Sequence, residues 1–436
     1  MTRRFPAVIF AAVLLVAPSI GAEPLPPAAT PESVGLSGER LERLRAVMQE
    51  YADEGRVAGV VTYVARNGRV AHLEAAGMAD IEAGRAMQKD TIFRIASQTK
   101  AFVSVAVMML VEEGRIGLAD PVARFLPAFE KTTVAVPSAA DSSVDVVPAK
   151  RAITIHDLLT HTAGISYGEG PGQDQWKAAG IQGWYFADRD EPVSAVVERM
   201  ASLPMDAQPG DRFVYGYNTD ILGVVVETVS GMTLAEFFEK RITGPLGLED
   251  TRFYLPPARK DRLAAVYTAK DGGIERATDP RLGQGHYVEG PRLAFSGGAG
   301  LLSTARDYGR FLQALLGGGE IDGARLLSPK SVELMTVNHV GPRLAEAWDD
   351  RHGMGFGLGF DVVVDLGEYA RHGSLGAWGW GGAYHTIYWV DPKEDLVALL
   401  MTQLRPAGDS DIQRRFRALV YQSIVGPAEG TPAAER

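Results

Sequence analysis

The stretch SQTKAFVSVAVMMLVEE, residues 97–113, is apolar on all sides after its first turn and ends before Gly114. A helix on a protein surface keeps one polar face, so a helix that is apolar all round is buried. A glycine directly after the last apolar residue is also a common helix end. The stretch therefore predicts a helix in the middle of a large core. The chain can supply that core, because it has 436 residues, of which 46% are hydrophobic and 22% charged.

Two pairs of β-strands are predicted, one toward each end of the chain. Residues 57–66 and 70–77 flank Asn67-Gly68, which is the strongest short-range sequence signal for a β-hairpin. Residues 384–390 and 395–403 flank a second, proline-containing turn. We expect these strands to form one antiparallel sheet.

A one-sided apolar stripe predicts a helix at each end of the domain. Ser37 can cap the first helix. The apolar positions recur at helical spacing and are Leu41, Leu44, Met48 and Tyr51 in the first helix and Ile412, Phe416, Leu419 and Ile424 in the second. Each stripe must be buried against another layer, so we expect both terminal helices to pack on the sheet.

The middle of the chain is predicted to be mostly helical. Two pairs of residues resemble capping boxes that open helices, and they are Thr233 with Glu236 and Thr304 with Asp307. Residues 131–150 and 168–190 are expected to be long loops; the second carries Trp176 and Trp184 and is either a lid or a plain surface loop. The expected fold class is α/β (α+β), with sheet regions at about 33–96 and 290–425 and a helical insert at about 97–289.

The first 22 residues predict a secretory signal peptide. Arg3 and Arg4 precede an apolar run at 7–16, and small residues precede Glu23. A membrane anchor is the alternative, but the run is too short to span a bilayer comfortably. We expect an exported, periplasmic or secreted protein without stable membrane insertion. Its expected parts are the signal peptide at 1–22, a linker at 23–32, one domain at 33–425 and a disordered tail at 426–436.

The composition argues against several classes of partner. Acidic residues number 54 against 44 basic ones, and the resulting net charge of -10 repels the phosphate backbone of nucleic acids. The chain has no cysteine, so it has neither disulfides nor thiolate metal sites. The eight histidines are scattered, and no phosphate-binding or dinucleotide motif is present. We therefore expect no nucleic acid, metal or cofactor.

Ser166 lies in GISYG, residues 164–168, which matches the G-x-S-x-G nucleophile elbow of many lipases and esterases. An elbow needs a buried strand before the serine and a helix after it. Residues 154–162 have helical spacing instead, and a segment rich in glycine follows Ser166. We interpret Ser166 as a decoy, a serine in a loop. The same context disfavours a triad of Ser166, an aspartate and His385, although the order of the residues allows it.

Ser97 is the better candidate nucleophile, because Lys100 follows it by three positions on the predicted buried helix. Residues i and i+3 share a helix face, so the amine of Lys100 can reach the hydroxyl of Ser97. The positive end of the helix dipole also lies at Ser97. Burial disfavours a charged ammonium, and the amine can then accept the serine proton. A solvated lysine on the first turn is the alternative.

Six motifs in a fixed order extend this signal. They are Ser97-Gln98-Thr99-Lys100, LVEEGRIGLADPVARFLP (110–127), LLTHTAGI (158–165), PGDRFVYGYNTDILG (209–223), SGGAGLLSTARDYGRFL (296–312) and WGGAYHTIYWVDP (380–392). Over residues 33–425 the chain resembles the class C β-lactamase and penicillin-binding-protein superfamily of serine hydrolases, and most of all the family VIII carboxylesterases. The resemblance implies a β-lactamase/transpeptidase-like fold, which agrees with the pattern above. It also implies a G-x-S-x-G that is not catalytic.

The resemblance implies further site residues. It places the proton-relaying tyrosine at Tyr215, with Tyr217 as the competing choice. Asn218 matches the substrate-binding asparagine of the lactamases, but it follows Tyr215 by three positions where they have two. In place of their Lys-Thr-Gly this chain has Trp380, Gly381 and Gly382, so a tryptophan stands where a cation would bind a substrate carboxylate. The implied oxyanion hole consists of the amides of Ser97 and Ala383.

The expected function is cleavage of short acyl esters through an acyl-enzyme on Ser97, with a small-molecule ester as the substrate and no cofactor. Activity as a β-lactamase on β-lactam-like substrates, as a D-alanyl-D-alanine carboxypeptidase or as an acyltransferase is the enzymatic alternative. An inactive relative that binds peptidoglycan is the alternative of another class.

Overall fold

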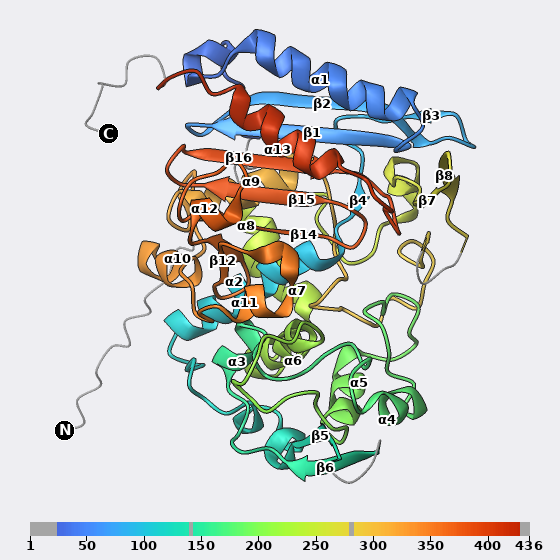
Figure 1. Cartoon of the computed structure of the whole chain (residues 1–436), viewed down its shortest axis with the longest axis vertical. Coiled ribbons are helices and arrows are strands. Elements are labelled where there is room, and N and C mark those ends of the chain that lie inside the picture. Colours follow the sequence, from blue (N-terminus) through green and yellow to red (C-terminus); the bar gives the residue numbers. More distant parts are fainter. Residues whose placement is uncertain (1–23, 139–142, 279–282, 428–436) are drawn as a thin grey trace, which may run out of the picture.

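The sheet that the sequence predicts is present and is larger than expected. The computed structural model describes residues 24–138, 143–278 and 283–427, so the predicted signal peptide and most of the predicted tail lie outside it. Eight antiparallel strands pair in the order β12-β13-β14-β15-β16-β1-β2-β3 (Figure 1). Their bounds are β1 Gly59–Arg66, β2 Arg69–Asp80, β3 Arg85–Ala86, β12 Met354–Phe356, β13 Asp361–Val363, β14 Trp378–Gly381, β15 Ile387–Asp391 and β16 Leu396–Met401.

The two ends of the chain meet in the middle of this sheet. β1 pairs with β16 from Val61 opposite Met401 to Arg66 opposite Leu396. All eight residues of β1 are buried, because both faces of the sheet are covered. Val60 and Val64 contact one hydrophobic layer and Val61 contacts the other, as the two-residue period of a strand requires.

The terminal helices α1 (Gly38–Asp53) and α13 (Ile412–Gln422) pack together on one face of the sheet (Figure 1). The four predicted apolar positions of α1 are all buried. In α13 the buried stripe is Ile412, Phe416 and Val420. The predicted Leu419 is only partly buried, because the buried stripe follows a row of residues four positions apart. Ile424 continues that row but lies beyond the end of the helix.

The opposite face of the sheet packs on α2 (Thr99–Glu112) and α9 (Ala305–Leu316). Every residue of α2 from Thr99 to Leu110 is buried, so the predicted central helix is confirmed. Its α-helical part begins two residues later than expected, and Ser97 lies in a preceding 3₁₀ turn, η2 (Ala96–Gln98).

The remaining chain forms a helical region below the sheet in Figure 1 and short elements at its edges. The helices are α3 Ile155–Leu159, α4 Gln173–Ala178, α5 Val193–Met200, α6 Asn218–Ser230, α7 Leu234–Phe238, α8 Gly244–Leu246, α10 Pro329–Met335, α11 Arg343–Ala347 and α12 Leu366–Tyr369. The further strands are β4 Phe93–Arg94, β5 Thr133–Pro137, β6 Val144–Pro148, β7 Tyr267–Lys270, β8 Gly273–Arg276, β9 Leu302–Ser303, β10 Glu320–Ile321 and β11 Ala324–Arg325.

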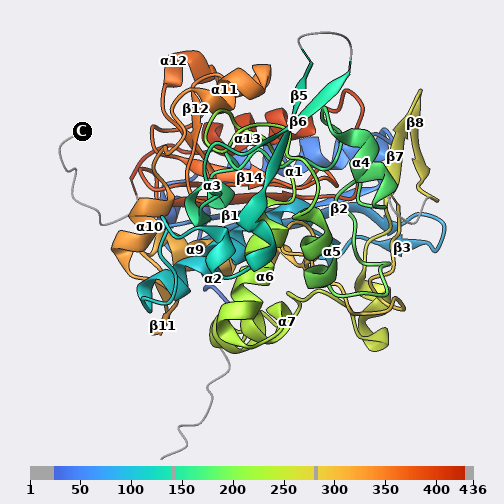
Figure 2. The ribbon, with the colours of Figure 1, turned by 90° about the horizontal axis from the view of Figure 1, so that it is seen from below.

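Two predictions about this region need correction. Residues 131–150 are not a plain loop, because β5 and β6 pair as a hairpin that extends from the helices (Figure 2). Its register brings Val134 opposite Val147, and cross-strand pairs of this kind stabilise a ribbon. Thr233 and Glu236 form a complete capping box, as predicted. The Thr304 side chain accepts from the backbone amide of Asp307, which is one half of a capping box. The Asp307 carboxylate accepts from the backbone amide of Asp250 instead of that of Thr304, so the box is incomplete.

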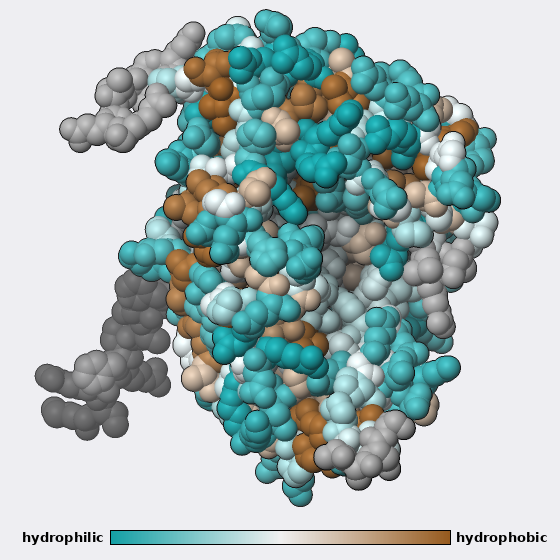
Figure 3. All heavy atoms as spheres, in the orientation of Figure 1, coloured by the Kyte–Doolittle hydropathy of each residue, from teal (hydrophilic) through white to brown (hydrophobic). Residues whose placement is uncertain are grey.

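One face of the molecule is mainly hydrophilic. Hydrophilic side chains cover most of the face in Figure 3, and the hydrophobic residues there form small separate groups. Within the described ranges, no helix taken singly has the length and apolarity to cross a bilayer; α6 joined to the 234–246 segment meets both criteria, but the two are bent by 77°.

His72, a buried residue of β2, makes the stability of the fold sensitive to acid. Burial lowers its pKa to about 4, and its Nε2 lies 2.8 Å from the Thr62 hydroxyl. Between the ordinary histidine pKa and that value only the unfolded chain binds the proton, so acid favours unfolding. Between about pH 7.5 and pH 5, we expect the unfolding free energy of His72→Gln to fall by about 2 kcal/mol less than that of the wild type. Urea unfolding at the two pH values measures it; equal losses in both proteins would contradict it.

Candidate active site

Ser97 is held in a strained turn at the entrance to α2. The preceding residue Ala96 is fully buried and has φ 43°, in the left-handed region that costs a non-glycine residue energy. β4 leads into this turn and pairs with β9, and the amide of Ile95 donates to the Leu301 carbonyl over 3.2 Å. Ser97 itself remains partly exposed, so its hydroxyl is accessible next to a rigid support.

Lys100 lies under Ser97 and is 1% exposed. Its Nζ is 3.4 Å from the Ser97 Oγ, 3.2 Å from the Tyr167 hydroxyl and 2.7 Å from the Gly298 carbonyl oxygen. The ring of Tyr215 lies 4.7 Å from the same nitrogen. The predicted proximity of Ser97 and Lys100 is therefore present, and an uncharged amine here can accept the serine proton.

The carbonyl of Gly298 is fixed by a buried carboxylate, that of Asp220 in α6. Asp220 Oδ1 accepts from the Ser296 hydroxyl at 2.6 Å and from the Gly298 amide at 3.0 Å. Burial raises the pKa of Asp220, while the nearby Lys100 lowers it. A Cβ on Gly298 would come within 2.3 Å of Asp220 Oδ2, so only glycine fits there. Asp220 thus holds the turn that anchors Lys100.

Tyr215 faces Lys100 from the loop before α6, and its hydroxyl has a single donor. Trp380 Nε1 in β14 donates to the Tyr215 hydroxyl over 3.0 Å. His161 supports the other side of the ring, with 4.6 Å between the ring centroids. Burial holds the pKa of His161 well below its usual range, and Lys100 lowers it further. Tyr215 is therefore oriented by Trp380 and packed on the His161 ring.

Tyr167 is a site residue that the sequence analysis missed. It belongs to GISYG, and its hydroxyl contacts Lys100 as described above. Burial raises the pKa of Tyr167 well above its usual range, as does the neighbouring Tyr215. Ser166 instead accepts from the Gly168 amide over 3.1 Å, and the loop reaches it from α3 rather than from a strand. The motif contributes its tyrosine to the site, and no signal in the sequence distinguishes that tyrosine from a packing residue.

A glycine brings the two loops with these tyrosines together. A Cβ on Gly216 would lie 2.3 Å from the Ser166 carbonyl carbon, so a larger residue would push the loops apart. Tyr217, the competing choice, is fully buried, donates to the Gly183 carbonyl over 2.6 Å and stacks on Trp176. The Tyr217 hydroxyl is thus bonded to the Gly183 carbonyl, away from Lys100.

The position of Asn218 does not support its predicted role in substrate binding. Asn218 is fully buried at the start of α6. Its amide nitrogen lies 2.9 Å from His161 Nδ1 and donates to the carbonyls of Ile165 at 3.1 Å and Val214 at 3.2 Å. The side chain therefore ties together the loops that carry Tyr167 and Tyr215.

The Trp380-Gly381-Gly382 segment lies directly against the turn before Ser97. A Cβ on Gly382 would come within 2.4 Å of the Ile95 carbonyl oxygen, so glycine is required for this approach. The amide of Gly382 donates to the Thr386 carbonyl, which closes the turn into β15. Ala383 follows and packs in the same cluster as Ala96. The structure thus brings both predicted oxyanion-hole residues, Ser97 and Ala383, to one place.

The predicted loop at 168–190 contains the short helix α4, and its two tryptophans differ in position. Trp176 is 1% exposed, and its Nε1 donates to the Pro204 carbonyl over 2.8 Å. Trp184 is partly exposed and lies edge-on to Tyr384, with 5.7 Å between the ring centroids. Tyr384 directly follows Ala383, so the second half of the loop borders the site.

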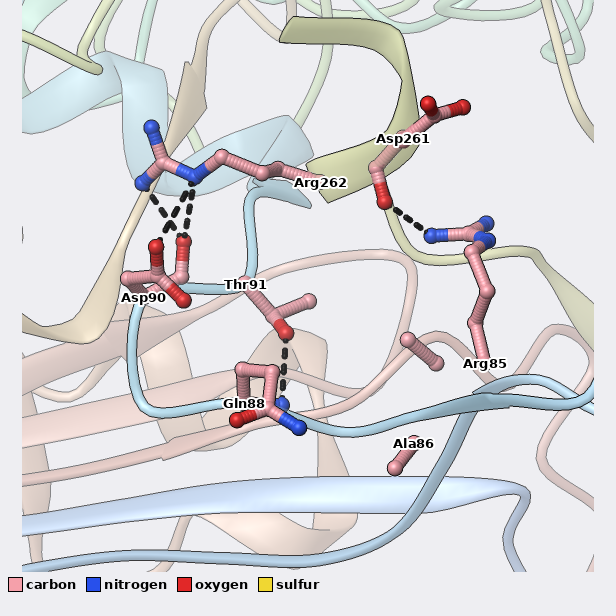
Figure 4. Close-up of a pocket in the computed structure, with 8 residues that line it drawn as sticks. Arg85, Ala86, Gln88, Asp90, Thr91, Asp261 and Arg262 are labelled. Atoms are coloured by element: carbon pink, nitrogen blue, oxygen red, sulfur yellow. Dashed lines mark hydrogen bonds and ion pairs between the residues drawn. The ribbon is translucent and has the colours of Figure 1, made fainter.

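A pocket of about 230 Å³ lies apart from these residues, beside β3 (Figure 4). In this pocket Arg262 forms an ion pair with Asp90, and Arg85 donates to the backbone carbonyl of Asp261. Among residues 24–138, 143–278 and 283–427, no group of three acidic or histidine side chains is placed to hold a metal ion. Ser97, Lys100 and their neighbours are therefore the candidate site.

Comparisons with known proteins agree with this geometry. The Beta-lactamase family model matches residues 44–422. The chain belongs to this family. Esterase EstB of Burkholderia gladioli is 33% identical over 387 residues, which cover 84% of this chain and 91% of EstB. Protein Rv1367c of Mycobacterium tuberculosis is 37% identical over 393 residues, covering 84% of this chain and 90% of that protein.

The solved structures include a close match in fold. EstCE1, described as a hydrolase with promiscuous acyltransferase activity, superposes with a TM-score of 0.75 and 29% identity, over 88% of this chain and 98% of EstCE1. The Beta-lactamase family membership, the mixed fold with its antiparallel sheet and the resemblance to family VIII esterases are thereby confirmed. The protein is a serine hydrolase of the β-lactamase fold, with esterase, acyltransferase and carboxypeptidase-like homologues.

Proposed function

We propose that the protein hydrolyses short acyl esters through an acyl-enzyme on Ser97. The observation that carries the proposal is the contact between Ser97 and the buried amine of Lys100, with the hydroxyl of Tyr167 and the ring of Tyr215 around the same nitrogen. Such an arrangement activates a serine without a histidine. The similarity to EstB supports an ester as the substrate.

The proposed reaction has two halves. Lys100 accepts the Ser97 proton while Oγ attacks the ester carbonyl, and the negative charge that develops on the carbonyl oxygen is stabilised by the amides of Ser97 and Ala383. Tyr215 donates its hydroxyl proton to the leaving alcohol as the carbon–oxygen bond breaks, and takes up in its place the proton that Lys100 accepted from Ser97. Water then attacks the acyl group by the same path, releasing the acid and restoring Ser97.

Trp380 favours esters over β-lactams and cell-wall peptides in this proposal. A lysine at this strand position would offer a positive charge to a substrate carboxylate. The indole of Trp380 is instead 7% exposed and donates its single N–H to the Tyr215 hydroxyl. Acyl transfer to an alcohol instead of water uses the same intermediate. The acyltransferase activity in the description of EstCE1 favours it as a second candidate.

The test compares three substrates with the purified protein: p-nitrophenyl butyrate, a chromogenic cephalosporin and a D-alanyl-D-alanine peptide. We expect kcat/KM for the ester to exceed the other two values by at least about 100-fold. Faster cleavage of the cephalosporin or the peptide would overturn the proposal. Adding an alcohol acceptor and measuring the new ester separates transfer from hydrolysis.

The hydrogen bond from Trp380 to Tyr215 gives a further prediction. Trp380→Phe keeps an aromatic ring but removes the donor, so the Tyr215 hydroxyl loses its orientation. We expect kcat/KM for p-nitrophenyl butyrate to fall about tenfold, as for one lost hydrogen bond. Trp378→Phe, on the same strand, is the matched control. Equal activity of wild type and Trp380→Phe would show that the bond has no part in catalysis.

A further inference from the structure

Arg405 presents a guanidinium next to the candidate site from the segment after β16. Its backbone is fixed: the amide donates to the Tyr267 carbonyl over 2.7 Å, and its carbonyl accepts from the Thr268 hydroxyl over 2.9 Å. The guanidinium carbon lies 4.9 Å from the centroid of the Trp184 ring. Arg405 Nη1 reaches the Ala383 carbonyl only at 3.4 Å. The fold thus directs this cation to the turn that follows Gly382.

No carboxylate of the described ranges pairs with Arg405. No ion pair within 4.0 Å includes it, and its Nε is buried without a hydrogen-bond partner. Arg351, which lies 5.4 Å from the Trp380 ring, is by contrast paired with Asp361 at 2.7 Å. A partly buried charge without a counter-ion is costly, and burial lowers the pKa of Arg405. The charge of Arg405 is therefore available to an anionic ligand.

Arg405 contacts the residue after Gly382, and Gly382 lies against the Ile95 carbonyl, two residues before Ser97. Ala383, whose carbonyl it contacts, packs in one cluster with Ala96, Tyr384 and Trp184. Ala96 directly precedes Ser97. The positive charge of Arg405 also lowers the pKa of Tyr167, whose hydroxyl lies 3.2 Å from Lys100 Nζ. Trp184, Ala383 and Arg405 are all partly exposed, as is Ser97.

We propose that Arg405, stacked on Trp184, binds a carboxylate carried by the ester substrate. The inference rests on the proposed function and names its substrate class: esters with a carboxylate on the acyl or the alcohol part. Arginine suits this role, because its planar fork binds a carboxylate through two parallel hydrogen bonds. The indole of Trp184 supports the guanidinium from one side by a cation–π contact, which takes up none of its hydrogen-bond donors.

The test measures selectivity between matched esters. Mono-p-nitrophenyl adipate against p-nitrophenyl hexanoate tests the acyl side, and 4-(hexanoyloxy)benzoate against 4-(hexanoyloxy)benzamide tests the alcohol side. We expect Arg405→Gln to lower at least one charged-to-neutral ratio of kcat/KM by tenfold or more. Arg417→Gln is the matched control, because Arg417 stacks on Trp389 at 4.1 Å on the other face of the sheet. Two ratios that stay the same in Arg405→Gln would overturn the inference.

A binding measurement on the wild-type protein covers the case in which Arg405→Gln fails to fold. Titration of tryptophan fluorescence should give at least tenfold tighter binding of adipate than of adipamide, and equal binding would overturn the inference. The two proposals also fail differently. Hydrolysis of p-nitrophenyl hexanoate with no preference for carboxylate refutes only the role of Arg405, whereas no hydrolysis of any of the four esters refutes the esterase.

Discussion

Replacing Ser97 by alanine will lower kcat for p-nitrophenyl butyrate by about 10⁴-fold or more. Loss of a nucleophile removes the covalent path and leaves only the binding and electrostatic contributions. Ser97 is partly exposed and makes no buried hydrogen bond other than that to Lys100, so the variant should fold normally. Initial rates with purified wild type and Ser97→Ala measure the effect.

Ser166→Ala is the matched control for this experiment. Ser166 lies one residue from Tyr167, so it is near the site, and its hydroxyl accepts from the Gly168 amide in its own loop. We expect its kcat to stay within about threefold of wild type, since a single local hydrogen bond contributes little. Loss of activity in Ser166→Ala with retention in Ser97→Ala would reverse the assignment of the nucleophile.

Replacing Lys100 by methionine will lower kcat/KM by about 10³-fold, because the proton acceptor for Ser97 is lost. Methionine has a similar length and fills the same buried space. The thermal midpoint should therefore not fall with the activity. Ester hydrolysis and thermal unfolding of the same preparation measure both quantities.

Lys330→Met is the control for Lys100→Met, because Lys330 is an exposed lysine on α10 whose side chain is 86% accessible. Its kcat/KM should match that of the wild type. Full activity of Lys100→Met would contradict the role of Lys100, and a large fall in its thermal midpoint would show that the loss of activity has a structural cause.

The fold could be predicted from the sequence where a pattern was strongly periodic. The signals for the hairpin around Asn67-Gly68 and for the buried helix α2 are local, because each depends only on residues that are close in the sequence. The edge strand β12 and its neighbour β13 have three residues each, too few for a period to be visible. The hairpin of β5 and β6 was missed because its strands contain prolines and exposed valines, which resemble a loop.

The site could be predicted only in part. Ser97 and Lys100 are three residues apart on one helix, so their contact follows from helix geometry. Tyr167, Asp220 and Arg405 come from three distant segments, and only the tertiary structure brings them near Lys100 or Ala383. Asn218 illustrates what a motif leaves open: its spacing from Tyr215 does not indicate that its amide donates to the carbonyls of Ile165 and Val214.

The most direct test of the account is to identify the residue that becomes acylated. The wild-type protein is treated with a fluorophosphonate, digested and analysed by mass spectrometry. The account predicts a single adduct, on the peptide that contains Ser97, and none in Ser97→Ala. An adduct on the peptide that contains Ser166, or one that persists in Ser97→Ala, would contradict it.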